Sequence, residues 1–417
     1  MILEKYSFGI GDRFCHQGKA QLSALMKAKE QGLSITPVWN KSHREHTIIG
    51  TTPADTRKEA LDAVKALQWD GPYFVDADHI GPGNVDRFIE SSDFFTLDVA
   101  DFITQPADKA DVDAFVKKYS KYIGSLAVEG IEQSLEITEE RIRAIGGEFL
   151  LAVRQAGGIY RHIAEAKGAG SFITEVSMDE TDQPQTPVEM LFILAAIAEE
   201  GIPAQTIAPK FTGRFNKGVD YVGDVTAFAK EFEEDLAVVN FAVREFGLPE
   251  NLKLSIHSGS DKFSIYAPIA EALKKFDAGL HVKTAGTTWL EELIGLAMAA
   301  PDGLSIAKEV YAKALHRFGE LCGPYATVID IYTAELPTAE QVDTWDGMNF
   351  ASALRHDQSC EQYNPNFRQL LHVAYKIAAE MGTRFSDALD RHEAVIAQNV
   401  AENIYDRHVR PVFMECR

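Results

Sequence analysis

Short apolar runs alternate with amphipathic stretches along the first two thirds of the chain. Eight runs have the length and composition of buried strands: Phe8–Gly11, Ile35–Trp39, Tyr73–Ala77, Phe94–Asp98, Phe172–Ser177, Gln205–Pro209, Leu252–His257 and Leu280–Thr284. Strands that alternate with helices are typical of a parallel sheet covered by helices, and eight is the number that closes a (β/α)8 barrel. The pattern therefore predicts an α/β fold of the TIM-barrel type.

Three helix starts are marked in the sequence. Thr52-Pro53-Ala54-Asp55 offers an N-cap, a proline at the first helical position and an acid in the first turn. Thr186-Pro187-Val188-Glu189 and Thr288-Trp289-Leu290-Glu291 both have the pattern of a capping box that opens an apolar helix. Each of the last two follows a predicted strand, as a strand–helix unit requires.

Two parts of the chain exceed what a simple barrel needs. The stretch from Asp98 to Phe172 is longer than one connection, and it contains three helical patterns, at Ala110–Tyr122, Glu139–Gln155 and Gly158–Gly168. The chain beyond Trp289 is also mostly helical, with a polar loop at Asn349–Asn366. We therefore predict a barrel over residues 1–290, with a helical insertion at about 102–170 between strands four and five, and a helical C-terminal extension over 291–417.

The composition is that of an ordinary globular protein and excludes several functions. Of the 417 residues, 46% are hydrophobic and 25% are charged, and the net charge of −21 argues against nucleic acid or an anionic membrane as a partner. The cysteines form no CxxC pair, which indicates reduced thiols; they are Cys15, Cys322, Cys360 and Cys416. Met1–Phe14 has no secretory pattern, and the longest apolar run, Met190–Ala198, is too short to span a bilayer. We expect a cytoplasmic protein.

Histidines occur where several of the predicted strands end. His79 directly follows the third strand, His257 ends the seventh, and His281 lies in the eighth. The active sites of TIM barrels lie at the C-terminal ends of the strands, so these imidazoles are expected to meet there. A single strand-end histidine is as often structural, but three together predict a metal site with open coordination positions.

Acidic residues accompany these histidines. Asp78 is a candidate base, and Asp76 should point into the barrel, where it would orient a ligand histidine. Glu175 lies inside an apolar strand, where burial would raise its pKa and suit a general acid. A structural ion pair is the alternative for Glu175, and the acids of the next loop (Asp179, Glu180 and Asp182) are alternatives for its role.

Other residues at strand ends are candidates for substrate binding. In His257-Ser258-Gly259-Ser260-Asp261-Lys262, small residues such as Ser258 and Ser260 leave backbone N–H groups accessible to an oxyanion or a phosphate. Lys210, Arg214 and Lys283 would bind a carboxylate, whereas Asp261 offers an acceptor. His16, His43 and His46, which follow the first two strands, are further candidates for substrate contact.

Taken together, these segments resemble the tagaturonate epimerase family of hexuronate catabolism. The resemblance is strongest at Asp76-Ala77-Asp78-His79-Ile80, at Glu175, at Ile256–Phe263 and at His281-Val282-Lys283. The layout is also similar to class II ketose-bisphosphate aldolases, which place an Asp-His pair, a later Glu and a His-containing small-residue loop on a metal-binding barrel. Those aldolases take one histidine from the strand that corresponds to Gln205–Pro209, where this chain has none.

The resemblance implies interconversion of D-tagaturonate and D-fructuronate with a divalent metal, which could be zinc, manganese, nickel, cobalt or iron. It implies Asp78 as proton acceptor and Glu175 as proton donor. It also implies His79, His257 and His281 as the metal ligands, and a homo-oligomer is possible.

The chemistry of this reaction restricts the mechanism. The two ketouronates differ at a carbon β to the ketone, so simple enolisation cannot invert it, whereas a retro-aldol opening and reclosure can. Direct deprotonation at that carbon is the other route, but the sequence has no dinucleotide fingerprint to assist it. A class II aldolase acting on a ketose or ketose phosphate is the nearest alternative. A non-catalytic uronate-binding scaffold is disfavoured because a binder needs neither Asp78 nor Glu175.

Overall fold

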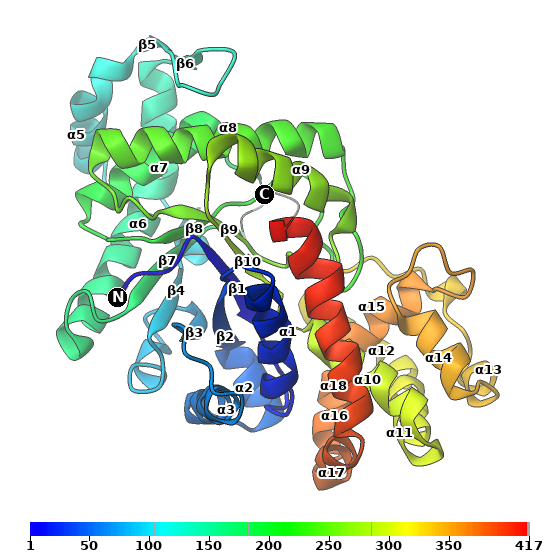
Figure 1. Cartoon of the computed structure of the whole chain (residues 1–417). Coiled ribbons are helices and arrows are strands. Elements are labelled where there is room, and N and C mark those ends of the chain that lie inside the picture. The colour runs from blue at the N-terminus through cyan, green and yellow to red at the C-terminus, as the bar shows by residue number, and fades with distance from the viewer. Residues whose placement is uncertain (104, 180, 182, 285, 415–417) are drawn as a thin grey trace.

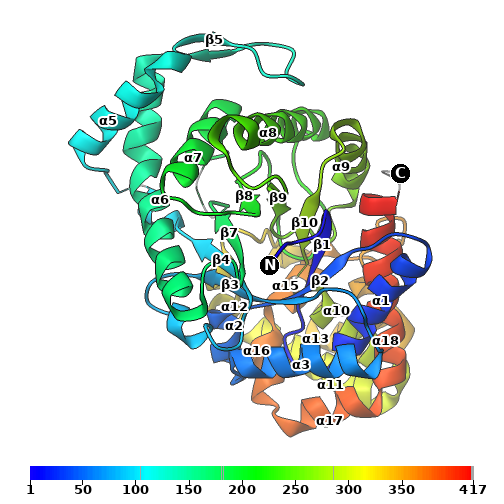
Figure 2. The same ribbon diagram turned by 60° about the vertical axis from the view of Figure 1, so that its left-hand side comes forward.

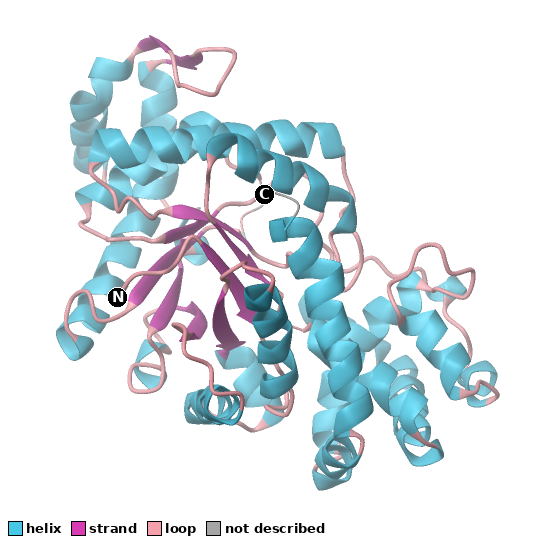
Figure 3. Cartoon of the chain, viewed as in Figure 1, coloured by secondary structure: helices cyan, strands magenta, loops and turns pink. Residues whose placement is uncertain are grey.

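The computed structural model describes residues 1–103, 105–179, 181, 183–284 and 286–414, and its centre is a closed barrel of parallel strands (Figures 1 and 3). The strands follow one another around the barrel in the order β1-β10-β9-β8-β7-β4-β3-β2. Their bounds are β1 Tyr6–Ile10, β2 Thr36–Ser42, β3 Phe74–Ile80, β4 Phe94–Asp98, β7 Ile173–Ser177, β8 Thr206–Ala208, β9 Lys253–Ile256 and β10 Leu280–Lys283. All eight predicted strands and the predicted TIM barrel are confirmed.

Helices follow most strands and cover the outside of the barrel. They are α1 Gly18–Glu30, α2 His43–Ile49, α3 Pro53–Ala66, α7 Pro187–Glu199, α8 Val225–Phe246, α9 Phe263–Phe276 and α10 Thr287–Ala299. The connection from β3 to β4 holds only the short 3₁₀ turn η1 (Val85–Arg87). The predicted helix start at Thr52 and the predicted capping box at Thr186 are confirmed. The one at Thr288 is wrong, because the N-cap of α10 is Gly286, two residues earlier, and it makes no side-chain cap.

The segment between β4 and β7 is helical, as predicted, and reaches away from the barrel strands (Figure 2). It consists of α4 Ala100–Ile103, α5 Lys109–Tyr119, η2 Ser120–Tyr122, β5 Gly124–Leu126, β6 Leu135–Ile137 and α6 Glu139–Lys167. The antiparallel pair β5–β6 was not predicted, and α6 is one continuous helix where the sequence suggested two.

The chain after α10 is helical almost to its end, again as predicted. Its elements are α11 Pro301–His316, α12 Phe318–Cys322, η3 Gly323–Tyr325, η4 Thr333–Glu335, α13 Ala339–Asp343, α14 Gly347–Leu354, α15 Pro365–Val373, α16 Tyr375–Glu380, α17 Thr383–Arg391, α18 Glu393–Glu402 and the π-helix η5 Asn403–Met414. The predicted loop at Asn349–Asn366 is shorter than expected, because α14 and α15 enter it from both sides. Helix α18 packs on α10 and α1, and η5 packs on α1 and α9 (Figure 1). The division of the chain at residue 290 stays a prediction.

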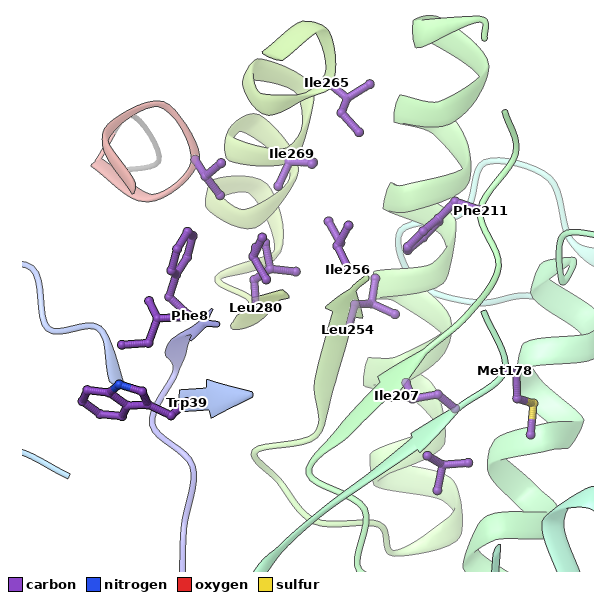
Figure 4. Packing of buried hydrophobic residues seen from close by; sticks show 14 of the residues in the cluster. Phe8, Trp39, Met178, Ile207, Phe211, Leu254, Ile256, Ile265, Ile269 and Leu280 are labelled. Carbon is purple, nitrogen blue, oxygen red and sulfur yellow. The ribbon is translucent and has the colours of Figure 1, made fainter. Parts of the chain in front are cut away.

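Side chains that point outward from the strands form the main hydrophobic core. Leu254 and Ile256 of β9 and Leu280 of β10 face α8 and α9, where they meet Ile265 and Ile269 (Figure 4). Side chains alternate along a strand. Ser255, between Leu254 and Ile256, and His281, next to Leu280, must therefore face the barrel interior. The core thus fixes which residues of each strand can contribute to a site inside the barrel.

The barrel interior changes from apolar to polar along the strands. Leu3, Val38, Phe74, Phe94 and Ile173 form a separate apolar cluster near the strand starts. Beyond it the buried interior residues are polar: Ser7, Asn40, Asp76, Thr96, Glu175, His281 and Lys283. This polar layer lies towards the strand ends, where the site was predicted.

Two further predictions concern the chain as a whole. In the described part of the chain, no helix combines the length and the apolarity needed to span a membrane. Cys15, Cys322 and Cys360 form no disulfide, and Cys416 lies outside the described residues.

Candidate metal and active site

The end of strand β3 is irregular, and this brings two neighbouring side chains to the barrel mouth. The register of β3 with β4 shifts between Ala77 and Ile80, and His79 adopts a left-handed backbone conformation with a φ of 52°. Such a conformation costs a non-glycine residue about 1–2 kcal/mol, so it persists only where the surroundings impose it. Asp78 and His79 consequently lie on the same side, with 3.8 Å between Asp78 Oδ1 and His79 Nε2.

His79 meets His257 and Asp179 at this mouth. The two imidazole rings are 5.0 Å apart and nearly perpendicular, and His257 Nδ1 lies 3.1 Å from Asp179 Oδ1. One ligand atom from each of the three residues lies within 4.8 Å of the other two. Within the described ranges, no other three His, Cys, Asp or Glu side chains come together in this way.

Each of the two imidazole rings is held by its own carboxylate, which contacts the ring nitrogen on the side away from the other two residues of the group. His257 Nε2 donates to Glu175 Oε1 at 2.7 Å, and His79 Nδ1 donates to Asp98 Oδ2 at 3.3 Å. Because an ionised carboxylate only accepts, these contacts fix the protonated nitrogen and leave the other one for a metal. His257 Nδ1 is buried and lies 3.1 Å from Asp179 Oδ1, so a nitrogen and a carboxylate oxygen face each other where a cation could bind.

The electrostatics of the mouth also favour a cation there. Burial opposes a charge on His79, but Asp78, Asp98 and Asp179 outweigh it and raise the pKa of His79 to about 10. Two imidazole nitrogens and a carboxylate oxygen are a donor set that suits zinc and similar divalent ions. These residues therefore fit a divalent metal.

Lys283 connects the remaining carboxylates of the site. Its Nζ lies 2.8 Å from Asp76 Oδ2, 2.8 Å from Asp78 Oδ1 and 3.0 Å from Glu175 Oε1, and the lysine side chain is only 4% exposed. Gly9 makes room for it, because a Cβ at this position would lie 3.2 Å from Lys283 Cγ. Three buried carboxylates thus share one ammonium group, and removing that charge would leave them without compensation.

This shared charge sets the protonation of the three acids. Burial opposes ionisation at Asp78 and Glu175, but the charges of Lys283 and the histidines lower the pKa of Asp78 to about 2 and that of Glu175 well below its ordinary value. At Asp76 burial prevails and raises the pKa to about 7. The prediction of a raised pKa for Glu175 is therefore wrong, because Lys283 stabilises its ionised form.

His281 lies apart from the other two histidines. Its side chain is fully buried, with Nδ1 2.9 Å from Ser7 Oγ and the ring 5.3 Å from that of Phe94. His281 and Lys283 share a strand face two residues apart, and Lys283 occupies the layer next to Asp78. The structure therefore does not bring His281 into the group of His79 and His257, and Asp179 takes the third place.

Comparisons with known proteins identify the family of this chain. The profile of the tagaturonate epimerase family matches residues 1–411. The chain belongs to the tagaturonate epimerase family. Members of this family are isomerases, and the protein is an enzyme of that class.

Individual relatives extend over nearly the whole chain. The tagaturonate/fructuronate epimerase of Thermotoga maritima is 29% identical over 97% of this chain and 80% of its own length. The native crystal structure of fructuronate-tagaturonate epimerase UxaE from Cohnella laeviribosi has a TM-score of 0.79 at 22% identity, covering 99% of this chain and 82% of its own. A two-glycerol complex of the same enzyme gives a TM-score of 0.79 at 21% identity, covering 99% and 83%. These crystal structures share the fold.

A cavity of about 400 Å³ opens beside His79, His257 and Asp179, which form the candidate metal group of this family member. His257 and Asp179 line it, and so do three residues predicted to bind substrate, Lys210, Arg214 and Ser258. The structure thus brings these three to one place next to the candidate metal site.

The other residues predicted to bind substrate have structural contacts instead. Lys283 is held by the three carboxylates, and Asp261 is fully buried, 2.8 Å from the Arg368 guanidinium. Ser260 is also buried, and its carbonyl accepts a hydrogen bond from Lys262. None of the three is among the described residues that line the cavity.

The histidines after the first two strands have partners away from the metal group. His16 Nδ1 lies 2.9 Å from Asp390 Oδ1, and His46 Nδ1 lies 2.9 Å from Thr51 Oγ1. The described lining of the cavity includes neither of them, nor His43.

Sequence reasoning missed several residues of the site. Asp179 was only one of three loop acids, of which Glu180 and Asp182 lie outside the described residues. Asp98 is the last residue of its strand, and Asp78 lies close to the end of its own. The strand-end argument that selected Asp78 could therefore also have selected Asp98. Arg44 and Lys217 also line the cavity, but they come from a helix and a loop, where position along the sequence gives no signal.

Proposed function

We propose that the protein interconverts D-tagaturonate and D-fructuronate with the help of a divalent metal held by His79, His257 and Asp179. The observation that carries this proposal is the convergence of these three side chains at the barrel mouth in a member of the tagaturonate epimerase family. The Thermotoga relative is named for the same pair of sugars. Cytoplasmic location and a homo-oligomer stay predictions.

The metal would supply Lewis-acid stabilisation of negative charge on the ketone oxygen of the substrate. Zinc, manganese, nickel, cobalt and iron all accept this donor set. His281 is left out of the ligand set, because its ring is hydrogen-bonded to Ser7 inside the barrel.

In this proposal Asp78 acts as the base. Lys283 lowers its pKa to about 2, so Asp78 is ionised at neutral pH and can accept the hydroxyl proton at the carbon to be inverted. Loss of that proton allows the carbon–carbon bond to open, and the aldehyde can rotate before the bond reforms. The proton on Asp78 then returns to the new hydroxyl group.

The role proposed for Glu175 differs from that of the proton donor implied by the family resemblance. It is fully buried and accepts a hydrogen bond from His257, so we propose that it positions this imidazole rather than donating a proton. This role is supported by its lowered pKa, since a carboxylate that stays ionised is a poor acid. Asp76, with a pKa near 7, is the acid of the cluster that most readily holds a proton.

Two variants separate metal binding from proton transfer. We expect Asp78→Asn to abolish turnover of D-tagaturonate while metal binding, measured by titration calorimetry on chelator-stripped protein, stays close to that of the wild type. We expect His79→Ala to lose both. Full activity of either variant would contradict the assigned site.

A further inference from the structure

We propose that Tyr325, from the C-terminal helical part of the chain, donates a hydrogen bond to an oxygen atom of the bound ketouronate, and that Tyr375 positions it. This inference rests on the proposed function and adds to it a binding residue that the barrel alone does not supply. The hydroxyl pair formed by the two tyrosines is the main observation that supports it.

The cavity beside the candidate metal group is formed by two parts of the chain. His257 lines it from the end of β9. Four more lining residues come from the segment after α12, and they are Pro324, Tyr325, Thr327 and Val328. Tyr325 ends the 3₁₀ turn η3 and carries a phenolic hydroxyl group. The C-terminal part of the chain therefore supplies a hydrogen-bonding side chain to the wall of the cavity.

The hydroxyl groups of Tyr325 and Tyr375 form a pair in which one proton is left over. The two oxygen atoms lie 2.9 Å apart. Each phenol has one proton to donate, but the bond between the two hydroxyls uses only one of these protons. Among the residues that the structure describes, neither hydroxyl has another hydrogen-bond partner. The second proton must therefore be accepted by something other than this part of the chain.

The burial of the two side chains indicates which hydroxyl holds the second proton. Tyr375 is 1% exposed and is not among the described residues that line the cavity, whereas Tyr325 is 6% exposed and lines it. A buried donor without an acceptor is costly, so the second proton belongs on Tyr325, where a ligand can accept it. Tyr375 then donates to Tyr325, and Tyr325 donates into the cavity. The hydroxyl, ketone and carboxylate oxygens of a ketouronate are suitable acceptors.

Two arginines hold the rings of these tyrosines. Arg13 Cζ lies 3.9 Å from the ring centroid of Tyr375, and the same guanidinium pairs with Glu45 at 2.5 Å. Arg44 Cζ lies 4.8 Å from the ring centroid of Tyr325. Arg13 follows β1, whereas Arg44 and Glu45 belong to α2, so both arginines come from the barrel. A donor that is already held in place loses less entropy when the ligand arrives, so these contacts preorganise Tyr325.

The test combines steady-state kinetics on D-tagaturonate with calorimetric binding of D-galactonate, a non-reacting sugar acid. We expect Tyr325→Phe to raise KM and to lower kcat/KM by roughly 3- to 10-fold, with kcat much less affected, because one neutral hydrogen bond to the substrate is lost. Galactonate binding should weaken by a similar factor. Tyr332→Phe is the matched control and should change neither, because Tyr332 is 64% exposed and is not among the described lining residues.

The variant Tyr375→Phe tests the positioning role. We expect it to raise KM less than Tyr325→Phe does. Added to Tyr325→Phe, it should raise KM no further, because Tyr375 acts through the hydroxyl of Tyr325. Additive effects of the two substitutions on KM would show that Tyr375 does not act through Tyr325 and would overturn this role.

An unchanged KM in Tyr325→Phe, or an equal rise in Tyr332→Phe, would overturn the role of Tyr325. If the wild-type protein does not convert D-tagaturonate, the proposed function fails, and galactonate binding then decides the inference alone. Weaker binding in Tyr325→Phe than in the wild type and in Tyr332→Phe would support it. No binding by the wild type, or equal binding by the three proteins, would overturn it.

Discussion

At the scale of single residues, Lys283 determines how the acids of the site behave. Its ammonium group contacts Asp76, Asp78 and Glu175 inside the barrel, and it keeps the last two ionised. A carboxylate in the same place without this lysine would take up a proton, because burial disfavours its charge. Asp78 and Glu175 are therefore kept ready to accept protons rather than to donate them.

The exclusion of His281 from the ligand set is testable at this scale. We expect His281→Asn to bind metal as the wild type does, because the His281 ring contacts Ser7 and Phe94 and not the metal group. Asp179→Asn should weaken metal binding by about 10- to 100-fold or more, the loss typical even of residues that only support a metal ligand. Titration calorimetry on stripped protein measures both. A large loss in His281→Asn with none in Asp179→Asn would reverse the assignment.

The sequence could predict which residues meet where the fold itself supplies the geometry. His79 and His257 lie together at the barrel mouth because strand ends in a barrel converge. His281 lies two residues before Lys283 on the same strand face, and therefore deeper in the barrel than the sequence predicted. The sequence did not define the strand boundary closely enough to show this. The pKa of Glu175 was misjudged because its partner, Lys283, is distant in sequence.

At the scale of elements, the helix α6 shows why local signals can mislead. Gly157 and Gly158 suggested a break between two helices, yet α6 runs from Glu139 to Lys167. A Cβ at Gly157 would lie 2.5 Å from Glu200 Oε2 and 3.2 Å from Glu200 Cβ. Gly157 thus permits close approach to the end of α7, and this tertiary contact could not be foreseen from the sequence.

Strand β9 begins with a buried lysine whose titration should affect stability. Lys253 Nζ donates to the carbonyl oxygens of Leu3 and Glu4 at the start of the barrel. Burial lowers the pKa of Lys253 to about 7. In the unfolded chain the pKa is about 10.4, so between these values the unfolded state binds a proton that the folded state lacks. Stability must then rise with pH over this range.

We therefore expect the free energy of unfolding of the wild type, relative to that of Lys253→Met, to increase from about pH 7 to about pH 10. The slope should approach at most about 1.4 kcal/mol per pH unit. Urea unfolding at several pH values measures it. Parallel pH profiles for the two proteins would show that the pKa of Lys253 is the same in the folded and unfolded states.

At the scale of the whole molecule, the barrel and the C-terminal helices meet at a buried ion pair. Asp261, just after β9, pairs with Arg368 of α15, and both side chains are fully buried. The sequence predicted that the small residues of His257–Lys262 bind an anion, but Asp261 in this segment joins the barrel to the C-terminal helices through Arg368. The pairing depends on contacts across 107 residues of sequence, so no local pattern indicated it.

Loss of this pair should be costly. We expect Arg368→Met to lower the free energy of unfolding by about 3–5 kcal/mol, because Asp261 would keep a buried charge without compensation. Arg384→Met removes an exposed arginine paired with Glu309 in the same helical part, and it should change stability by less than about 1 kcal/mol. Equal losses in the two variants, measured by urea unfolding, would contradict a special role for the buried pair.

The most direct test of the proposed reaction is an NMR assay of chelator-stripped protein on D-tagaturonate, with and without added manganese, zinc or nickel. The account predicts that D-fructuronate appears only when metal is present. Three-carbon products would mean that the cleaved bond is not reformed and that the protein acts as an aldolase. No conversion with any of these metals, or equal conversion without them, would contradict a metal-dependent epimerase.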